Sequence, residues 1–331
     1  MAEVRVTWFQ RQLEKRLFPD NSFLKYSKNG GQPNVATVEI PQATTSNRPV
    51  LGGVNSGYTT TANNLANASA LTPIIRVNDK LSYNNTIIRL PKPIIIETLQ
   101  EAELSYNKAA QIAEEEALNL NTAIADYALA NWAQDNANYI IPTTGLSKAG
   151  IVETRNGSVT GGLAGSVKRF AFEDMLALQT AIQKQNISDG QWVALPTVEQ
   201  WADIKRFLDV DFEQTANESM LRSGVLGKFG RILFLDPRQN DLYNANVVYD
   251  LTAPTAPVPV AFDGTVNVNC VSALLCWNAN YVERNEGSLV FYSRTKDPLY
   301  MGDIMNWGVR FGASKRRLDG KGVIAMYENP S

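Results

Sequence analysis

The apolar residues of this chain recur with two different periods, which indicate where helices and strands lie. Between residues 98 and 133, apolar or small side chains fall three and four positions apart, and Thr98 with Glu101 forms a capping box at the start. This pattern predicts one helix of about 50 Å at 1.5 Å per residue, with a narrow, alanine-rich stripe that another backbone can approach closely. The opposite face, which we expect to meet solvent or another subunit, carries Glu114, Glu115, Glu116 and Asp126.

Shorter periodic segments predict the remaining elements. Helices are expected at 172–184 and 198–208. Strands are expected at 35–40, 81–90, 192–195, 232–235, 247–251, 268–277, 288–293, 304–311 and 323–327, with a strand-like run at 73–77 and an edge segment at 258–262. We expect Pro41 to end the first strand and Asn78-Asp79 to mark a chain reversal. Helices and strands are segregated along the chain, which favours an α+β fold over a doubly wound sheet.

The last predicted strand is preceded by a cluster of basic residues. Asp319-Gly320 suits the central positions of a type I′ turn, so residues 315–324 are expected to form a hairpin. Its returning strand, 323–327, is apolar on both faces and should be covered on both sides. The tip of this hairpin carries Lys315, Arg316, Arg317 and Lys321. We expect these cations to meet solvent, nucleic acid or the acidic surface of another chain.

Two segments are too poor in apolar residues to build a core of their own. Residues 1–34 are predicted to begin with a short amphipathic helix, followed by a Pro/Asn/Gly-rich stretch. The apolar residues of that helix are Trp8, Phe9, Leu13, Leu17 and Phe18. Residues 42–70 consist mainly of Thr, Asn, Ser, Gly and Ala. Such a composition is either disordered or ordered by a neighbour. We therefore predict an N-terminal arm followed by a long hairpin over residues 36–90.

Composition narrows the classes of function. The chain has 331 residues, with 31 basic against 33 acidic side chains, so no overall charge favours general binding to nucleic acid or membrane. No apolar run is long enough to span a membrane, and the N-terminal residues do not resemble a signal peptide. The chain contains no histidine, which removes the commonest general base and metal ligand and makes an enzyme less favoured.

Other candidate motifs are weak. Cys270 and Cys276 would lie on one face of a strand about 20 Å apart at 3.3 Å per residue, so we expect reduced core thiols. The glycine-rich run 161–168 lacks the order of a phosphate-binding loop. The carboxylates of Asp209, Asp211 and Glu213 lack the spacing of a calcium loop. No catalytic, cofactor-binding or metal-binding residue is assigned.

Several short motifs occur in an order that is known from one family. They are Val38-Glu-Ile40-Pro41-Gln42, Lys80-Leu-Ser-Tyr83, Glu103-Leu-Ser-Tyr-Asn-Lys108, Asp297-Pro-Leu-Tyr-Met-Gly-Asp-Ile304, and Arg310-Phe-Gly through Val323. In this order the chain resembles the major capsid proteins of tailed bacteriophages with the Hong Kong 97-type fold. The resemblance covers nearly the whole chain as an order of elements, through motifs built of common residues.

The resemblance implies a division of the chain into parts. These are an N-terminal arm at 1–35, a projecting E-loop at 36–92, a spine helix and the first part of a peripheral domain at 93–186, an axial domain at 187–265, and a return to the peripheral domain with closing β-strands at 266–331. It also implies a non-enzymatic protein without cofactors, whose hexamers and pentamers build the icosahedral shell around the double-stranded DNA of a tailed phage. Such a protein assembles in the cytoplasm of the host bacterium and resides in the virion capsid.

The resemblance also suggests partners and contact residues. A separate scaffolding protein is expected because the sequence has no long charged N-terminal coiled segment; a portal, decoration or auxiliary head proteins and non-specifically contacted DNA are further expected partners, and no membrane is. The candidate subunit-contact or DNA-facing residues are Arg310, Lys315, Arg316, Arg317 and Lys321. Adjacent-subunit carboxylates are the first expected partner of the basic tip. Changing Arg316 and Arg317 together to Glu should then leave the monomer folded and prevent shell formation.

Three alternatives stay open at this point. An encapsulin-type shell would enclose cargo enzymes instead of a genome. A soluble hydrolase that uses carboxylates would be a monomer or small oligomer with a cleft. A tail or sheath component would form tubes. Sedimentation and electron microscopy of the expressed protein separate these outcomes.

Overall fold

The chain divides into two compact units. The computed structural model describes residues 23–32, 35–43, 78–89, 92–97, 108–149, 154–155, 158–159, 166–208, 225–235, 247–252, 257–262 and 269–331. One unit comprises Glu39–Ser82, and the other comprises Met1–Val38 with Tyr83–Ser331. The predicted strand at 73–77 and the predicted loops around 161 and 211 lie outside the described residues.

The described residues of the smaller unit lie in a two-stranded sheet. It pairs β2 (Thr37–Ala43) with β3 (Asn78–Asn84), and an exposed ion pair joins Glu39 Oε1 to Lys80 Nζ at 2.6 Å. Two expectations were wrong here. Pro41 lies inside β2 instead of ending it. An edge strand permits this, because proline has no N–H to donate and costs no ladder hydrogen bond on the unpaired side. Asn78 and Asp79 belong to β3 and do not form a reversal.

Three helices carry the apolar stripes that the sequence predicts. The described helix α3 (Lys108–Trp132) covers most of the predicted long helix, and residues 98–107 lie outside the described part. Helices α4 (Phe172–Lys184) and α5 (Val198–Leu208) begin and end as predicted. Thr197 and Gln200 form a capping box at α5: each side chain accepts from the other residue's backbone N–H. Asp126 on α3 is buried within its own chain and faces neither solvent nor another subunit as expected, because α3 is covered on more than one side.

An eight-stranded sheet forms one layer of the larger unit. Its strands are β6 (Ile140–Pro142), β11 (Trp192–Leu195), β12 (Val225–Phe229), β13 (Ile232–Leu235), β14 (Val247–Asp250), β15 (Val258–Pro259), β16 (Cys270–Asn278) and β19 (Val323–Tyr327). Along β19, Val323, Ala325 and Tyr327 pack into the core on the α3 side, whereas Ile324 and Met326 pack into the core on the α4 side. The sheet is thus covered on both faces, as the apolar run at 323–327 predicts.

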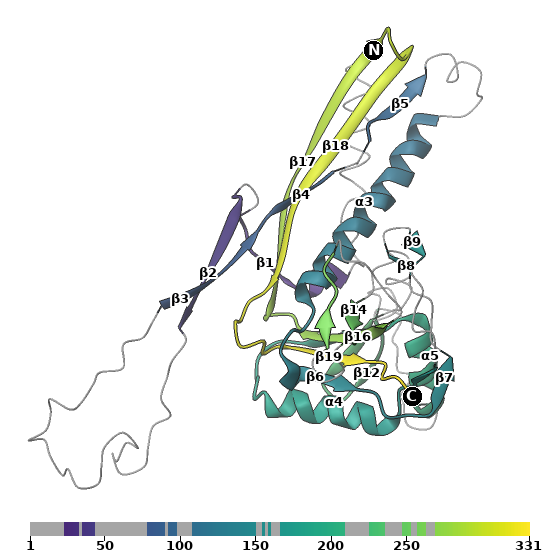
Figure 1. The fold of residues 1–331 in the computed structure, drawn as a ribbon. Helices are drawn as coiled ribbons and strands as arrows, with labels where there is room; N and C mark the ends of the chain where they lie inside the picture. Colours follow the sequence, from purple (N-terminus) through teal and green to yellow (C-terminus); the bar gives the residue numbers. More distant parts are fainter. Residues whose placement is uncertain are drawn as a thin grey trace, which may run out of the picture. The chain divides into compact units, whose positions relative to one another are not determined.

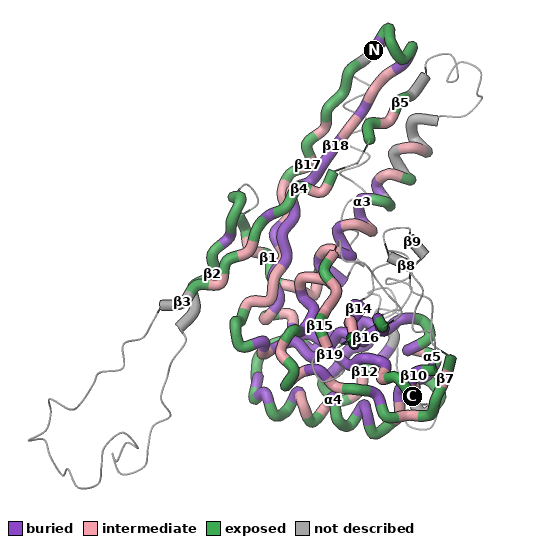
Figure 2. The backbone as a smooth tube through the Cα atoms, in the orientation of Figure 1, coloured by how far each residue is buried: buried purple, intermediate pink, exposed green. Residues whose placement is uncertain are grey.

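A five-stranded sheet forms the second layer beside α3 (Figure 1). It contains β1 (Lys28–Asn29), β4 (Thr86–Arg89), β5 (Ile94–Glu97), β17 (Val282–Asp297) and β18 (Gly302–Lys315). The long strands β17 and β18 pair antiparallel, and both β4 and β5 pair with β18. Figure 2 shows that buried residues concentrate where the sheets and α3 meet and thin out toward the β17–β18 turn.

Smaller elements complete the described chain. They are the short helices Phe23–Tyr26 and Ala137–Tyr139, the pair β7 (Ser147–Ala149) with β10 (Ser166–Lys168), and the pair β8 (Thr154–Arg155) with β9 (Ser158–Val159). Cys270 and Cys276 are buried, free thiols on β16, as predicted. Within the described residues, none of the helices combines the length and apolar character needed to cross a lipid bilayer.

The predicted C-terminal hairpin was wrong. Strand β18 pairs with β17, β4 and β5, whereas β19 pairs with β16 and β6 in the other sheet. Gly320 has positive φ but Asp319 does not, and Gly320 N–H donates to Arg317 O at 3.3 Å. The turn therefore spans residues 317–320, and residues 316–322 connect two sheets instead of closing a hairpin. Pairing in a sheet that is covered on both faces buries more of β19 than a local hairpin would.

Candidate interface at the basic connector

The four basic residues around the connector between β18 and β19 all have carboxylate partners in the same chain. Lys315 Nζ lies 2.5 Å from Asp135 Oδ1, just beyond α3. Arg317 Nη2 lies 2.7 Å from Asp319 Oδ2, and Lys321 Nζ lies 4.0 Å from the same carboxylate. Intrachain carboxylates were not among the partners expected for this cluster.

Arg316 belongs to a buried ion pair. Its Nε donates to Glu283 Oε2 at 2.9 Å, and the Tyr83 hydroxyl donates to Glu283 Oε1 at 2.9 Å. The side chain of Glu283 is 6% exposed and that of Arg316 is 27% exposed. Each carboxylate oxygen therefore has a donor, and the pair ties β17 to the connector and to the end of β3.

Backbone segments close to Glu283 are fixed by side-chain amides. Asn85 Nδ2 donates to Val35 O at 2.6 Å, and Asn285 Nδ2 donates to Gln32 O at 2.6 Å. A Cβ on Gly30 would lie 2.6 Å from Glu283 Oε1, so a larger residue at this position would displace the Glu283 carboxylate. The junction around Glu283 is thus closely packed and hydrogen-bonded.

Glutamine side chains hold the connector itself. Gln134, which follows α3, donates its Nε2 to Gly320 O at 2.7 Å and to Val323 O at 2.6 Å. Gln185, which follows α4, accepts at Oε1 from Gly322 N at 2.8 Å. The connector is therefore anchored to the ends of two helices, and it is not a free tip.

The ion pairs and hydrogen bonds around the connector shift the pKa values of three side chains. Burial, together with the hydrogen bond and the negative charge of Glu283, raises the pKa of Tyr83 above its ordinary value. Burial opposes the ionised form of Asp319, but hydrogen bonds from Arg317 and Lys321 lower its pKa overall. The hydrogen bond to Asp319 raises the pKa of Arg317. The Arg317–Asp319 pair therefore stays ionised near neutral pH.

A second buried ion cluster lies near the C-terminus. Lys148 Nζ is 2.6 Å from Asp203 Oδ2 and 2.7 Å from Glu328 Oε1, and all three side chains are at most 10% exposed. Burial acts to lower the pKa of Lys148, but the charges and hydrogen bonds of Glu328 and Asp203 raise it overall. The cluster joins β7, α5 and the residue that follows β19.

The fifth candidate residue lies apart from the connector. Arg310 is half-buried on β18 opposite Ile87 of β4, about 17 Å along the strand from Lys315 at 3.3 Å per residue. The structure brings the other four candidates together. It also adds Glu283, Tyr83 and Asp135 to the site. No local sequence signal identifies these partners, because they are far from the basic residues in the chain.

The described residues do not form a metal site that could support catalysis. Among them, no group of three or more His, Cys, Asp or Glu side chains is placed to hold a metal ion. The basic groups around the connector pair with carboxylates of the same chain: Asp135, Glu283 and Asp319. The geometry is that of a structural junction with an exposed basic edge formed by Arg317 and Lys321.

No protein-family model matches the sequence, and no curated protein matches it. Among solved structures, the capsid of cyanophage P-SCSP1u is similar at 14% identity and a TM-score of 0.56, covering 94% of this chain and 89% of that chain. The mature capsid of bacteriophage PhiM1 is similar at 13% identity and a TM-score of 0.51, covering 94% of this chain and 88% of that chain. The capsid of Ralstonia phage GP4 is similar at 9% identity and a TM-score of 0.50, covering 96% of this chain and 90% of that chain. The chain therefore has the Hong Kong 97-type fold of phage capsid proteins, with mixed α and β composition.

Proposed function

We propose that this chain is the major capsid protein of a tailed bacteriophage. Copies of it self-assemble into the icosahedral head shell that encloses the double-stranded DNA genome. One observation carries the proposal: the fold is similar to that of phage capsid chains over 94% of this chain and 89% of the other. The protein has a structural role and is not an enzyme.

The parts of the chain take the roles that this fold suggests. Residues 1–35 serve as the N-terminal arm and 36–92 as the E-loop, and both contact neighbouring subunits. Helix α3 is the spine helix. We assign α3 with β5, β17 and β18 to the peripheral domain, to whose sheet the arm adds β1 and the E-loop adds β4, and we assign the eight-stranded sheet with α4 and α5 to the axial domain.

This assignment moves the expected domain boundaries. Strands β6, β16 and β19 lie outside residues 187–265, but they pair within the same sheet as β11. A domain that is one hydrogen-bonded sheet with one core is the natural unit, so the axial domain takes in these three strands. The chain accordingly leaves and re-enters the axial domain more than once.

The exposed basic edge remains our candidate for contact with an adjacent subunit, with packaged DNA as the second choice. Arg317 and Lys321 are the suitable residues, since their side chains are 46% and 43% exposed. Arg316 is unsuitable for the double Glu variant, because a carboxylate at 316 would face the buried Glu283. The variant R317E/K321E should fold and fail to form shells, whereas the control K184E/K205E on exposed helix positions should form them. Normal shells from R317E/K321E would contradict the contact.

Partners follow from the shell proposal. The subunits form hexamers and pentamers, with a separate scaffolding protein, a portal and decoration or auxiliary head proteins completing the head. DNA is contacted non-specifically. The protein assembles in the bacterial cytoplasm and resides in the virion capsid.

Sedimentation and electron microscopy of the expressed full chain test the proposed function. Closed icosahedral shells are the expected result. Tubes would indicate a tail component, and monomers or small oligomers under all assembly conditions would contradict the proposal. Nuclease treatment followed by mass spectrometry then separates a genome shell from a shell that encloses a cargo protein.

A further inference from the structure

An exposed apolar turn joins β17 to β18. Its residues Leu299, Tyr300 and Met301 are all exposed, and Leu299 is the most exposed of them at 79%. Figure 2 shows exposed residues where the two strands join. Three consecutive exposed apolar side chains are unfavourable in water, and such a surface usually marks a place where another molecule binds.

The turn is held in one conformation by the buried carboxylate of Asp297. One of its oxygens accepts from Leu299 N at 2.8 Å, and the other lies 3.0 Å from Arg294 Nε. Met301 has a φ of 48°, which is uncommon and strained for a residue with a side chain. Residues 299–301 are called the apolar knob below. Because the knob is preorganised, it loses little conformational freedom on binding.

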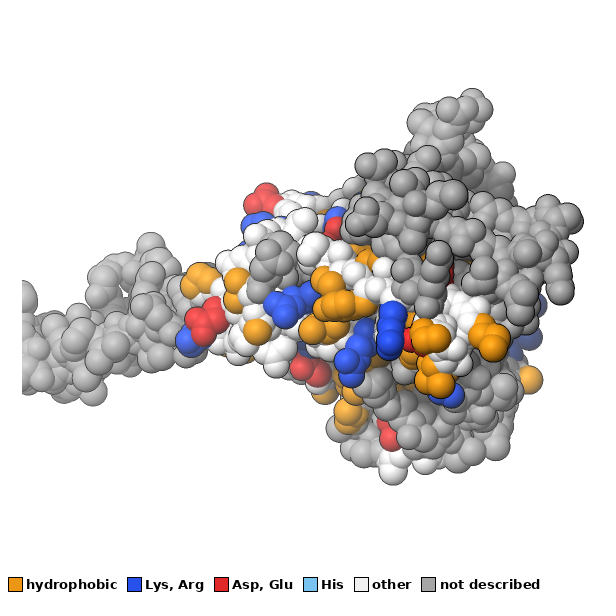
Figure 3. Space-filling view, turned by 90° about the horizontal axis from the view of Figure 1, so that it is seen from above, with side chains coloured by type: hydrophobic (Ala, Val, Ile, Leu, Met, Phe, Trp, Pro, Cys, Tyr) orange, Lys and Arg blue, Asp and Glu red, His pale blue; other side chains and the backbone are white. Residues whose placement is uncertain are grey.

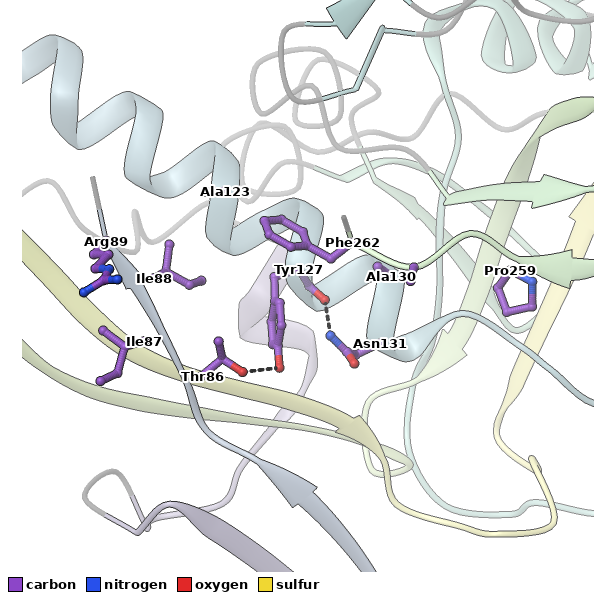
Figure 4. Close-up of a pocket in the computed structure, with 11 residues that line it drawn as sticks. Thr86, Ile87, Ile88, Arg89, Ala123, Tyr127, Ala130, Asn131, Pro259 and Phe262 are labelled. Atoms are coloured by element: carbon purple, nitrogen blue, oxygen red, sulfur yellow. Dashed lines mark hydrogen bonds between the residues drawn. The ribbon is translucent and has the colours of Figure 1, made fainter. Parts of the chain in front are cut away.

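A groove lies between α3 and the strands β4 and β5. Its larger part has a volume of about 680 Å³, and the neighbouring part has about 360 Å³. Ile88, Arg89 and Ala123 line both parts, so the two are continuous. Figure 4 shows Tyr127 reaching from α3 toward Thr86 of β4 in the larger part. Most of the lining residues are apolar, so the groove suits an apolar occupant.

The polar groups of the groove narrow the choice of occupant. Arg89 and Lys92 are exposed, so an uncharged occupant leaves their charged ends in water. Figure 3, a view from above, shows basic side chains among hydrophobic ones on the exposed surface. Glu116 Oε2 is buried and has no hydrogen-bond partner among the described residues. The groove therefore fits apolar side chains that bring one hydrogen-bond donor, and the Tyr300 hydroxyl of the knob is such a donor.

The knob cannot reach the groove of its own chain. Ile94 of the groove pairs with Met305 of β18, and Ile88 pairs with Val309. These positions are about 13 and 26 Å from Met301 along the strand at 3.3 Å per residue. Strand β18 pairs with β17 on one side and with β5 and β4 on the other, so it cannot fold back. The two surfaces can therefore meet only between copies.

We propose that the apolar knob of one copy docks in the groove between α3 and β4–β5 of a second copy. Leu299 and Met301 pack against the apolar lining, and the Tyr300 hydroxyl donates to Glu116 Oε2. The knob and the groove are different surfaces of the chain. The contact is therefore head-to-tail and can repeat from copy to copy.

The size of this contact indicates where it forms. Three side chains that each bury about 150–200 Å² cover roughly 500 Å² of the knob. A stable pair of proteins needs about 800 Å² per partner, so the knob alone does not hold two isolated chains together. The contact forms where other contacts already bring copies close to one another. It thus rests on the proposed function, which it deepens by naming one contact between subunits.

Photo-cross-linking of the full chain tests the contact. Leu299 is replaced by p-benzoylphenylalanine, and equal amounts of ¹⁴N- and ¹⁵N-labelled chains are mixed, concentrated under assembly conditions and irradiated. We expect cross-links from residue 299 to peptides that contain residues 86–94, 116–131 or 257–262, including pairs that join the two isotopes. The contact is overturned if all groove cross-links join chains of one isotope, if the cross-links go to other peptides or to nucleic acid, or if none form.

Variants of the groove and of the hydrogen bond give a second test. Ala123→Phe fills the groove and should lower the yield of groove cross-links about fivefold or more. The matched control Ala177→Phe, at an exposed position of α4, should leave the yield unchanged. Tyr300→Phe should lower it about two- to tenfold, and should have no effect once Glu116 is replaced by leucine. Equal yields from Ala123→Phe and Ala177→Phe would contradict docking in the groove.

Electron microscopy scores shell formation separately. Shells without groove cross-links refute only the contact between knob and groove. Groove cross-links in tubes or small oligomers refute only the proposed function.

Discussion

Replacing Arg316 with methionine should destabilise the fold far more than the same change one residue later. The Arg316–Glu283 pair is mostly buried: Glu283 is 6% exposed, and the two charged atoms are 2.9 Å apart. Methionine keeps much of the apolar stem of Arg316 and removes the charge. The variant therefore leaves a buried carboxylate with the Tyr83 hydroxyl as its remaining side-chain donor.

The expected loss in the free energy of unfolding follows from the burial of the Arg316–Glu283 pair. Removing one partner of a buried ion pair costs about 3–5 kcal/mol, because the remaining charge stays desolvated. Arg316 is 27% exposed, so water can enter the vacated space, and we expect the lower end, about 3 kcal/mol. Arg317→Met is the matched control: its pair with Asp319 is largely exposed and should be worth about 0–1 kcal/mol.

Urea unfolding of the unassembled full chain measures both variants. A midpoint shift at unchanged slope reports the free energy of unfolding directly. Adding Glu283→Gln to Arg316→Met should recover part of the loss, because the uncompensated charge is then gone. The reasoning fails if Arg316→Met lowers the free energy of unfolding no more than Arg317→Met does. It also fails if adding Glu283→Gln lowers the free energy of unfolding further.

The remaining predictions concern backbone strain, a buried lysine and alkaline pH. Gly322→Ala should lower the melting midpoint more than Gly31→Ala, because φ is +91° and +68° at these positions but only the Cβ at 322 would overlap an aromatic side chain. Lys148→Met should cost about 3 kcal/mol at pH 7, because it removes the ammonium group that lies between the buried carboxylates of Asp203 and Glu328. Urea unfolding measures this cost, and a loss below about 1 kcal/mol, the range for exposed ion pairs, would count against the cluster. Burial raises the pKa of Tyr249 and Tyr83 above 10.0, so the stability they contribute is complete below pH 10 and is lost as the pH rises beyond it. Tyr249→Phe should weaken this alkaline loss, measured by unfolding together with phenolate absorbance.

Sequence patterns over a few residues correctly predicted the helices and strands whose ends are set by residues nearby in the chain. Helices α4 and α5 and strand β11 begin and end as expected. At α5 the start signal is visible in the sequence, because Thr197 and Gln200 stand three positions apart and cap each other. Proline before a helix and apolar spacing within it act over a few residues, so no distant contact is needed to read them.

The C-terminal segment shows where local patterns were insufficient. Asp319-Gly320 favours a hairpin when it is considered alone, yet β19 pairs with β16 and β6. The apolar run at 323–327 correctly indicated a strand covered on both faces, but it could not indicate which strands would flank it. Tertiary pairing prevailed because a central position in the larger sheet buries every residue of β19.

The candidate site depended even more on distant residues. The sequence singled out Arg316 by its charge, but its partner Glu283 lies 33 positions earlier, and the Tyr83 bond spans 200 positions. Asp126 was expected to face solvent or another subunit, but it is buried within its own chain, since periodicity along one helix does not report how many sides of it are covered.

The sequence by itself determined which segments form helices and which form strands, and that β19 is apolar on both faces. It also determined that the two cysteines are free thiols in the core and that the connector carries basic charge. These properties follow from side-chain chemistry over short stretches of the chain. The tertiary structure decided which strands share a sheet, which carboxylates neutralise the connector and which helix faces are covered. Those outcomes depend on chain segments that meet only after folding, where burial of apolar area and the pairing of desolvated charges outweigh local turn preference.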